Sequence, residues 1–313
     1  MTEPVHDPFR HLFDLARGLP PITTAVVHPC DPSAVEGAIG AARAGLIVPI
    51  LVGPLARIRA AAQLAGVSLD GVEMIDAPHS HAAATKAVEL VRAGRAEAIM
   101  KGSLHTDELM GAVVDHATGL RTARRVSHCF VMDLRGRPEP LIITDAAVNI
   151  APSLDEKADI VRNAIDLATA IGFAEVRIAI LSAMETVNSK VPSTIEAAAL
   201  CKMADRGQIT GALIDGPLAL DNAIDLEAAR VKQIRSKVAG RANVLVVPDL
   251  EAGNMLAKSL SFLADADSAG IVLGARVPVV LTSRADSVMA RLGSCALALL
   301  MVHARRAGRA PLP

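Results

Sequence analysis

The chain has 313 residues, more than one compact core usually serves, so we expect two domains or lobes. Hydrophobic residues make up 51% and the formal net charge is −1, a balance that argues against the basic surface of a nucleic-acid-binding protein. The four cysteines show no zinc-ligand spacing and no disulfide framework. The start, "MTEPVHDPFRHLFDLARG", is too polar for a signal peptide, and the longest apolar run is too short to span a membrane. We therefore expect a cytoplasmic protein.

Short β-branched runs alternate with longer amphipathic segments along nearly the whole chain. Strands without polar alternation, separated by helices, indicate a mostly parallel sheet covered on both faces, and hence an α/β fold. In chain order the expected strands lie at 24–28, 47–53, 72–76, 97–102, 127–133, 141–145, 176–182, 211–216, 243–249, 269–274 and 277–283.

One helix start is well marked in "APSLDEKADIVRNAIDLATAIG". Ser153 and Glu156 have the spacing of a capping box, an apolar stripe follows from Val161 to Ile171, and Gly172 closes the helix. The preceding loop, "DAAVNIAPS", is a candidate crossing point between the two lobes.

The common nucleotide and hydrolase motifs are missing: the sequence holds no GxGxxG, GxxxxGK[ST], GxSxG or HExxH. In open α/β sheets, ligands still bind beyond the carboxyl ends of the strands, so polar residues there are the natural candidates.

Two candidate groups lie in the first half of the chain. Lys101 and Ser103 end a strand directly before a helix, where they either bind an anion or form an ordinary capped turn. Farther on, Arg121, Arg124 and Arg125 form either a solvated basic loop or a phosphate-binding cluster.

The next strand ends are also ambiguous. His128 and Cys129 are adjacent on a strand and point to opposite faces, so they cannot form a dyad, and His128 is either structural or functional. Asp145 and Asn149 serve either the turn or a binding site. Acidic residues at later strand ends form no convincing set of metal ligands.

The segment "TSRADS" follows the last expected strand and precedes a long helix. Asp286 or Ser287 is expected to cap that helix. Capping does not explain Arg284, because a cation near a helix N-terminus opposes the helix dipole unless an anion is bound there. Ser283 and Arg284 together therefore predict a receptor for a phosphate or an oxyanion.

The chain resembles the phosphate acetyl/butyryltransferase family along essentially its whole length. The segments that carry the resemblance are "MKGSLHT", "RVSHCF", "ITDAAVNIAPSLDEKADIVRNA", "AMETVNSKVPSTIEAA", "DGPLALDNAI" and "VPVVLTSRADS", and three of them look nearer to the butyryltransferase branch. The resemblance implies a two-lobed fold like that of isocitrate and isopropylmalate dehydrogenases, with an interdomain cleft and a homodimer. The first lobe is expected at 1–145, completed by 270–313, and the second at 146–269.

The resemblance also implies the reaction, in which acyl-CoA and phosphate are interconverted with acyl phosphate and CoA. It implies small-molecule substrates only, with no metal, no cofactor besides CoA as substrate, and no nucleic-acid or membrane partner. Ser283 would then stabilise the oxyanion and Arg284 would bind phosphate. The other candidate substrate contacts are Lys101, Ser103, Arg124, Asp145 and Asn149.

One departure from the family concerns the base for the CoA thiol. Phosphotransacetylases carry an acid seven residues after the serine, where this chain has Ala290. Asp286 is the first candidate for the base and His128 the second; otherwise phosphate or water takes the proton.

Two other functions remain open on the sequence. One is a metal- and NAD(P)-dependent dehydrogenase on the same superfamily fold, which would need a convergent acidic metal cluster. The other is a non-catalytic protein that binds acyl-CoA or acyl phosphate, consistent with the missing acid.

Overall fold

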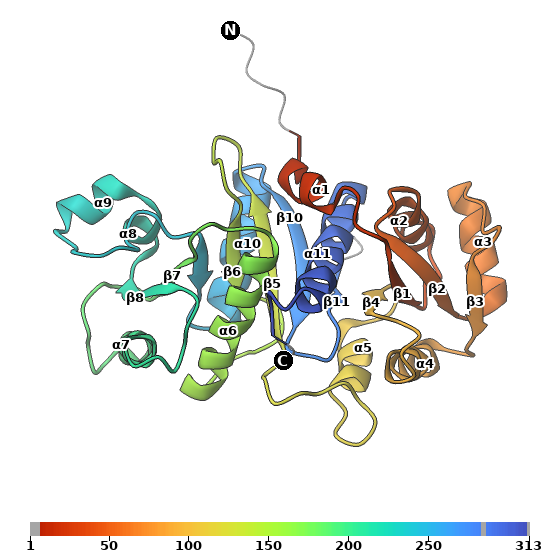
Figure 1. The fold of residues 1–313 in the computed structure, drawn as a ribbon, viewed down its shortest axis with the longest axis horizontal. Helices are drawn as coiled ribbons and strands as arrows, with labels where there is room; N and C mark the ends of the chain where they lie inside the picture. The colour runs from red at the N-terminus through yellow and green to blue at the C-terminus, as the bar shows by residue number, and fades with distance from the viewer. Residues whose placement is uncertain (1–6, 283–285, 312–313) are drawn as a thin grey trace, which may run out of the picture. The chain divides into compact units, whose positions relative to one another are not determined.

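The computed structural model describes residues 7–282 and 286–311. The chain forms two compact units (Figure 1). Unit 1 contains the described residues up to Val126 and those from Ala269 onward, and unit 2 is Ser127–Ser268.

Unit 1 is built from parallel strands covered by helices on both faces. Its sheet has the order β3-β2-β1-β4-β11-β10, and every pair is parallel except β10 with β11. Helices α2 and α3 pack on the opposite side of these strands from α4 and α5 (Figure 1). The elements are α1 (Arg10–Ala16), β1 (Ile22–Val27), α2 (Pro32–Arg43), β2 (Ile47–Gly53), α3 (Leu55–Ala65), β3 (Glu73–Asp76), α4 (Ser80–Arg92), β4 (Ala98–Lys101), α5 (Thr106–Val113), β10 (Asp267–Leu273), β11 (Val279–Val280) and α11 (Val288–Arg306).

Helix α11 forms much of the core of unit 1. Its 19 residues have a mean hydropathy of 1.3 over an 18-residue window, enough by length and composition alone for a membrane span. However, 72% of that window is buried in the structure. Gly293 lies so close to Phe9 that a Cβ there would be 2.8 Å from the phenyl ring. Packing inside unit 1 therefore accounts for the apolar composition of α11.

Unit 2 has the strand order β5-β6-β9-β7-β8, in which only β5 and β6 are antiparallel. Helices α6 and α7 pack together, and α8 packs on α9. The core includes the fully or almost fully buried Ile143, Ala179, Leu218 and Leu245. The elements are β5 (Ser127–Asp133), β6 (Leu141–Thr144), α6 (Leu154–Ala170), β7 (Arg177–Leu181), α7 (Pro192–Asp205), β8 (Leu213–Leu218), α8 (Leu220–Ile224), α9 (Leu226–Val231), β9 (Val244–Val246) and α10 (Leu250–Leu263).

The predicted capping box at the start of α6 is confirmed. The Ser153 N–H donates to Glu156 Oε2 at 2.8 Å, and the Glu156 N–H donates to Ser153 Oγ at 3.4 Å. Both contacts satisfy backbone donors that have no partner within the first turn of a helix. The helix ends at Ala170 with Ile171 as its C-cap, so Gly172 directly follows the helix, as predicted.

Each of the eleven expected strands corresponds to a strand of the structure, and the α/β class is confirmed. Within each unit, the expectation of parallel pairing holds for the described strands except at two hairpin-like pairs, β5 with β6 and β10 with β11. Strands β5 and β6 belong to unit 2, because β6 pairs with β9 there. The lobe boundaries expected at 145/146 and 269/270 remain a prediction, while the compact units change at Val126/Ser127 and Ser268/Ala269.

Candidate active site

The carboxyl ends of β1, β4 and β11 meet at one edge of the sheet in unit 1. These strands are parallel neighbours, with Val27 paired to Lys101 and Val280 paired to Met100. Just beyond β1 and β11, His28 and Thr282 both contact the end of β4: the Ser103 N–H donates to His28 O at 3.0 Å, and Lys101 Nζ donates to Thr282 O at 3.3 Å. This row is the part of unit 1 where ligands of open α/β sheets usually bind.

Gly102 allows β1 and β4 to approach closely beyond their ends. Its N–H donates to Val27 O at 2.9 Å. A Cβ on Gly102 would lie 2.4 Å from that oxygen and 2.8 Å from the carbonyl carbon of His28, so a side chain would clash with backbone. The glycine in "MKGSLHT" is therefore required by packing in unit 1.

Ser103 holds the loop that follows β1. Its hydroxyl donates to His28 O at 2.8 Å and accepts from the Cys30 N–H at 2.7 Å. The Ser103 N–H also donates to His28 O, at 3.0 Å. Ser103 does not cap the next helix, since α5 begins after His105. The predicted substrate contact through Ser103 stays a prediction, and the structure gives its hydroxyl a positioning role.

Lys101 places a cation at this edge. The residue is only 6% exposed, and its Nζ donates to the carbonyl of Thr282 at 3.3 Å. Thr282 directly precedes Ser283, so Lys101 lies next to the start of the "TSRADS" segment. Ser283 and Arg284 themselves lie outside the described residues. A buried ammonium beside a strand end is well suited to binding an anion.

A serine caps the N-terminus of helix α11. Ser287 is the N-cap residue, and its Oγ accepts from the Ala290 N–H at 3.1 Å. Capping thus does not account for Asp286, which is half-buried. Ala290, at the position of the family's acid, is buried in the first turn. The neighbouring Arg291 is 3% exposed and donates from Nη2 to Ser33 Oγ at 3.3 Å.

Arg124 belongs to a loop that is fixed to the end of β10. The Arg124 N–H donates to Thr122 Oγ1 at 3.1 Å, and that hydroxyl donates to Gly274 O at 2.6 Å. Arg124 is half-buried, whereas Arg121 and Arg125 are exposed. Of the three arginines, Arg124 is therefore the one whose backbone is most firmly placed for a binding role, which remains a prediction.

In unit 2, Asp145 organises the loop after β6. Its Oδ1 accepts from the N–H groups of Ala147 at 2.9 Å and Val148 at 3.0 Å, and its Oδ2 accepts from the Asn149 N–H at 3.2 Å. Burial raises the pKa of Asp145, although these hydrogen bonds act in the opposite direction. The Asn149 side chain donates to the same carboxylate. Both predicted residues are thus close together, and their contacts are those of a structured turn.

His128 is the second residue of β5 and directly precedes Cys129, which pairs with Thr144 of β6. It is 1% exposed and packs edge-to-face on Phe130, with ring centroids 4.4 Å apart. Burial lowers the pKa of His128 to about 3, so its ring is neutral at physiological pH. Its Nδ1 is buried and has no hydrogen-bond partner among the described residues, and the role of His128 as a base remains a prediction.

The acidic residues at the ends of β7 and β8 form an ion-pair cluster. Glu185 and Asp221 lie 3.2 and 3.3 Å from Lys232 Nζ, and Glu185 also accepts from Asn222. Lys232 thereby offsets part of the negative charge of the two carboxylates. Within residues 7–282 and 286–311, no group of three His, Cys, Asp or Glu side chains could hold a metal ion.

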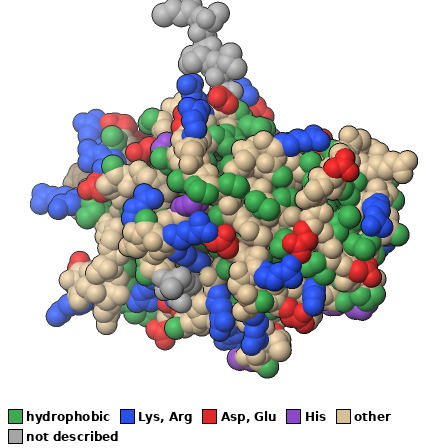
Figure 2. Space-filling view, turned by 45° about the vertical axis from the view of Figure 1, so that its right-hand side comes forward, with side chains coloured by type: hydrophobic (Ala, Val, Ile, Leu, Met, Phe, Trp, Pro, Cys, Tyr) green, Lys and Arg blue, Asp and Glu red, His purple; other side chains and the backbone are tan. Residues whose placement is uncertain are grey.

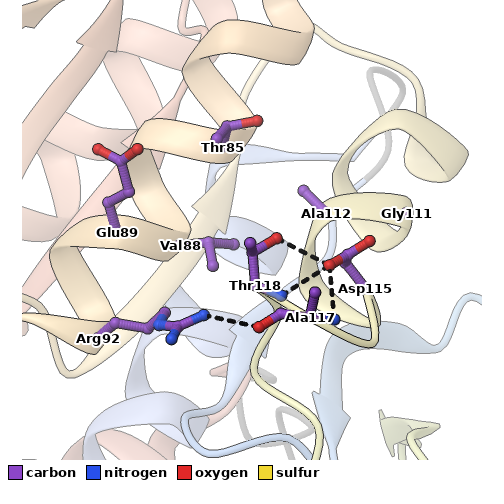
Figure 3. Close-up of a pocket in the computed structure, with 9 residues that line it drawn as sticks. All are labelled: Thr85, Val88, Glu89, Arg92, Gly111, Ala112, Asp115, Ala117 and Thr118. Carbon is purple, nitrogen blue, oxygen red and sulfur yellow. Dashed lines mark hydrogen bonds between the residues drawn. The ribbon is translucent and has the colours of Figure 1, made fainter.

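A pocket of about 390 Å³ lies between α4 and α5, away from the strand ends (Figure 3). Asp115 is turned back on its own loop, where it accepts from the N–H of Ala117 and from both N–H and hydroxyl of Thr118. Arg92 donates to the carbonyl of Ala117 at 3.3 Å. None of the predicted site residues lines this pocket, and its other two polar side chains, Thr85 and Glu89, bond to His81 and Lys86 on α4.

Charges of both signs are mixed over the visible face in Figure 2, without a continuous basic field. Several are paired, as Lys86 with Glu89 at 2.8 Å and Arg95 with Glu73 at 2.5 Å. This distribution agrees with the formal net charge of −1.

Solved structures define the class of protein to which this fold belongs. A branched-chain phosphotransacylase from Enterococcus faecalis superimposes with a TM-score of 0.78 at 30% identity, covering 90% of this chain and 99% of that one. A putative 4-hydroxythreonine-4-phosphate dehydrogenase from Salmonella typhimurium gives 0.58 at 15% identity over 90% and 99% of the two chains. The predicted dehydrogenase-like α/β fold is therefore confirmed, in the form that phosphotransacylases have.

Sequence comparison narrows the class to one family. The sequence profile of the phosphate acetyl/butaryl transferases matches residues 79–299. A phosphate acetyltransferase from Rhizobium meliloti is 64% identical over 96% of this chain and 95% of its own length. A phosphate butyryltransferase from Clostridium acetobutylicum is 41% identical over 87% and 90% of the two chains. The chain belongs to the phosphate acetyl/butyryl transferase family, as predicted.

Proposed function

We propose that the protein is a phosphate acyltransferase that moves an acetyl group reversibly between CoA and inorganic phosphate. The observation that supports this proposal most strongly is the 64% identity with a phosphate acetyltransferase over nearly the full length of both chains. Three relatives named phosphate butyryltransferase, one of them as probable, are 38%, 41% and 46% identical, below the 55–64% of four phosphate acetyltransferases. Acetyl is therefore proposed ahead of butyryl, although three short segments of the sequence look closer to the butyryl branch.

The chemistry requires an oxyanion donor and a phosphate receptor. The CoA sulfur attacks the carbonyl carbon of the acyl phosphate, the carbonyl oxygen becomes an oxyanion, and phosphate then leaves. We assign the oxyanion hydrogen bond to Ser283 and the phosphate contact to Arg284, both by resemblance to the family. Removing one such donor from an acyl-transfer site typically costs roughly 10²–10³ in kcat.

The described residues support this assignment through Lys101. Its ammonium contacts the carbonyl of Thr282, the residue before Ser283, at 3.3 Å. A cation at that point favours binding of the phosphate dianion and offsets the charge that develops on it. Arg124, Asp145 and Asn149 are retained as proposed substrate contacts, with the structure supporting a fixed backbone at each of their loops.

The sequence offers two candidates for the base that accepts the thiol proton. Asp286 is half-buried and is not the helix cap, which favours a role for it in the site. His128 is fully surrounded by protein in β5 and its pKa is low, which makes it the weaker of the two candidates.

The test is CoA-dependent thioester formation from acetyl, propionyl and butyryl phosphate by the purified protein. We expect activity with all three and the highest kcat/KM with acetyl phosphate. Ser283→Ala and Arg284→Ala should each lower kcat at least about tenfold, and the matched control Ser68→Ala, in an exposed turn, should not. Binding of CoA without turnover of any acyl phosphate would contradict the proposal and favour a non-catalytic binding protein.

We further propose that the reaction needs no metal and no organic cofactor besides CoA, its substrate. Activity that survives EDTA supports this proposal. Activity abolished by EDTA, together with formation of NAD(P)H from a hydroxy acid, would support the dehydrogenase alternative instead.

We also propose a cytoplasmic homodimer that acts on small molecules, with no nucleic-acid or membrane partner. Four free thiols favour a reducing compartment. Helix α10 of unit 2 exposes Met255 by 63%, Phe262 by 79% and Leu263 by 85%, which favours an oligomer contact there. Light scattering should give the mass of a dimer for the wild type and that of a monomer for Phe262→Lys; a monomeric wild type would contradict the dimer.

A further inference from the structure

Two buried polar atoms without partners lie in the row formed by His28, Gly102 and Thr282. Within the described part of the chain, His28 Nδ1 and Thr282 Oγ1 are both buried and have no hydrogen-bond partner. Leaving a buried donor or acceptor unpaired costs about 1–3 kcal/mol. Both residues contact the end of β4, His28 through the Ser103 N–H and Thr282 through Lys101, so two unpaired atoms at this ligand-binding edge indicate that a ligand supplies the missing partners.

Several hydrogen bonds fix the backbone of His28 in an uncommon conformation. Its φ of 52° is left-handed, a conformation that few residues other than glycine adopt, although histidine is among the more tolerant. The His28 carbonyl accepts from the N–H of Cys30 at 2.8 Å and from both the N–H and the hydroxyl of Ser103. On the other side, Gly53 lies close to His28: a Cβ there would be 3.3 Å from His28 Cα and 3.7 Å from Cδ2 of the ring.

The chemical state of the ring follows from its surroundings. His28 is 6% exposed. Burial and the charge of Arg57 on α3 lower its pKa, while Glu108 on α5 and Asp31 before α2 act in the opposite direction with less effect. The imidazole is therefore neutral at physiological pH and offers a lone pair to a proton donor. Burial also raises the pKa of the neighbouring Cys30, which stays a thiol.

We propose that His28 is the proton acceptor for the CoA thiol and that Thr282 holds the sulfur end of CoA beside it. The proposal rests on the acyltransferase function above and assigns the base that the chain lacks at Ala290. The S–H bond breaks and its proton passes to the imidazole, while the sulfur electron pair forms the bond to the carbonyl carbon. When the oxyanion collapses, the bond from carbon to the phosphate oxygen breaks, and the departing phosphate takes the proton from the imidazolium.

Several features of the row favour the thiol over the phosphate as its ligand. Lys101 already supplies a cation beside Thr282, whereas the neutral ring of His28 adds none. A thiol has an ordinary pKa of about 8.5, so it needs an acceptor at neutral pH. The low exposure of the ring also keeps bulk water away from it, so that a single positioned acceptor is effective there.

The pH dependence of CoA turnover tests the proposal. His28 accepts a proton only when neutral, so wild-type kcat/KM for CoA should fall as pH drops through a pKa below 6.5, and should be level above it. His28→Asn, chosen because asparagine tolerates the left-handed backbone, should lower kcat roughly 10²-fold or more. Its rate should instead keep rising with pH toward the thiol pKa of about 8.5, while KM for acetyl phosphate stays within threefold of the wild type.

Matched variants make each outcome decisive. Thr282→Val should lower kcat/KM for CoA and Thr282→Ser should restore it; the control Ser68→Ala, in an exposed turn, should keep the wild-type pH profile. The proposal would be overturned if Asp286→Asn, and not His28→Asn, changed the pH dependence of kcat/KM for CoA. If His28→Asn does not fold, a wild-type kcat/KM that does not fall at acidic pH would overturn it as well. A wild-type protein inactive with every acyl phosphate would instead refute the proposed function itself.

Discussion

Replacing Ser103 by alanine tests whether this hydroxyl positions the site or binds substrate. Ser103 Oγ donates to His28 O at 2.8 Å and accepts from the Cys30 N–H at 2.7 Å, and the variant loses both contacts. Each is worth roughly 0.5–1.5 kcal/mol net, and the Cys30 N–H keeps its bond to His28 O, so we expect a loss of about 1–2 kcal/mol. At roughly 2–4 °C per kcal/mol for a unit of this size, Tm should fall by about 2–8 °C.

The kinetics of the same variant separate the two roles. If Ser103 acts through the backbone of His28, Ser103→Ala should lower kcat and leave KM for phosphate and acetyl phosphate near the wild-type values. Ser103→Thr, which keeps the hydroxyl, should recover most of both losses, and Ser68→Ala in an exposed turn should change neither. An unchanged Tm together with a raised KM for phosphate would refute the positioning role and restore the direct contact.

Other consequences of the structure are open to measurement. Gly102→Ala should lower the free energy of unfolding by about 1–3 kcal/mol or more and reduce activity, because its Cβ would lie 2.4 Å from a backbone oxygen. A free energy of unfolding equal to that of the wild type would contradict this. Gly111→Ala, in helix α5 with open space around it, should instead stabilise by about 0.5–1 kcal/mol. Asp145→Ala should lower the free energy of unfolding, measured by chemical denaturation, by about 1–3 kcal/mol or more, since the N–H groups of the loop lose their acceptor. Asp145→Asn should lower it by less. Dialysis against EDTA should leave acyl transfer unchanged, and loss of activity that zinc or magnesium restores would oppose the metal-free mechanism.

The fold was largely predictable because its strongest signals are local. Buried parallel strands read as short β-branched runs, and the capping box of Ser153 and Glu156 fixes a helix start through two contacts three residues apart in sequence. The antiparallel pairing of β10 with β11 was not predictable, because pairing direction depends on contacts between segments and leaves no periodic mark on either strand.

The candidate site was predictable only where chemistry coincides with a strand end. Lys101 was found in this way, and the structure adds its contact with Thr282, a residue 181 positions away in sequence. His28 and Thr282 were missed because an unpaired buried atom is a property of the packed structure. The histidine that ends the run "TAVVH" was the available signal, since polar residues at carboxyl strand ends are candidates by position alone.

His128 shows the opposite case. A histidine next to a cysteine attracts attention in sequence, yet its place in β5 leaves the ring buried with a pKa of about 3. Sequence alternation correctly separates it from Cys129 but cannot tell how deeply the strand is covered.

The central claim is acyl transfer between CoA and phosphate, and one steady-state experiment tests it most directly. Purified protein is mixed with acetyl phosphate and CoA, and thioester formation is followed by its ultraviolet absorbance, with Ser283→Ala in parallel. We predict rapid acetyl-CoA formation by the wild type and a rate at least about tenfold lower for the variant. Thioester formation at equal rates by both proteins, or by neither, would contradict the account.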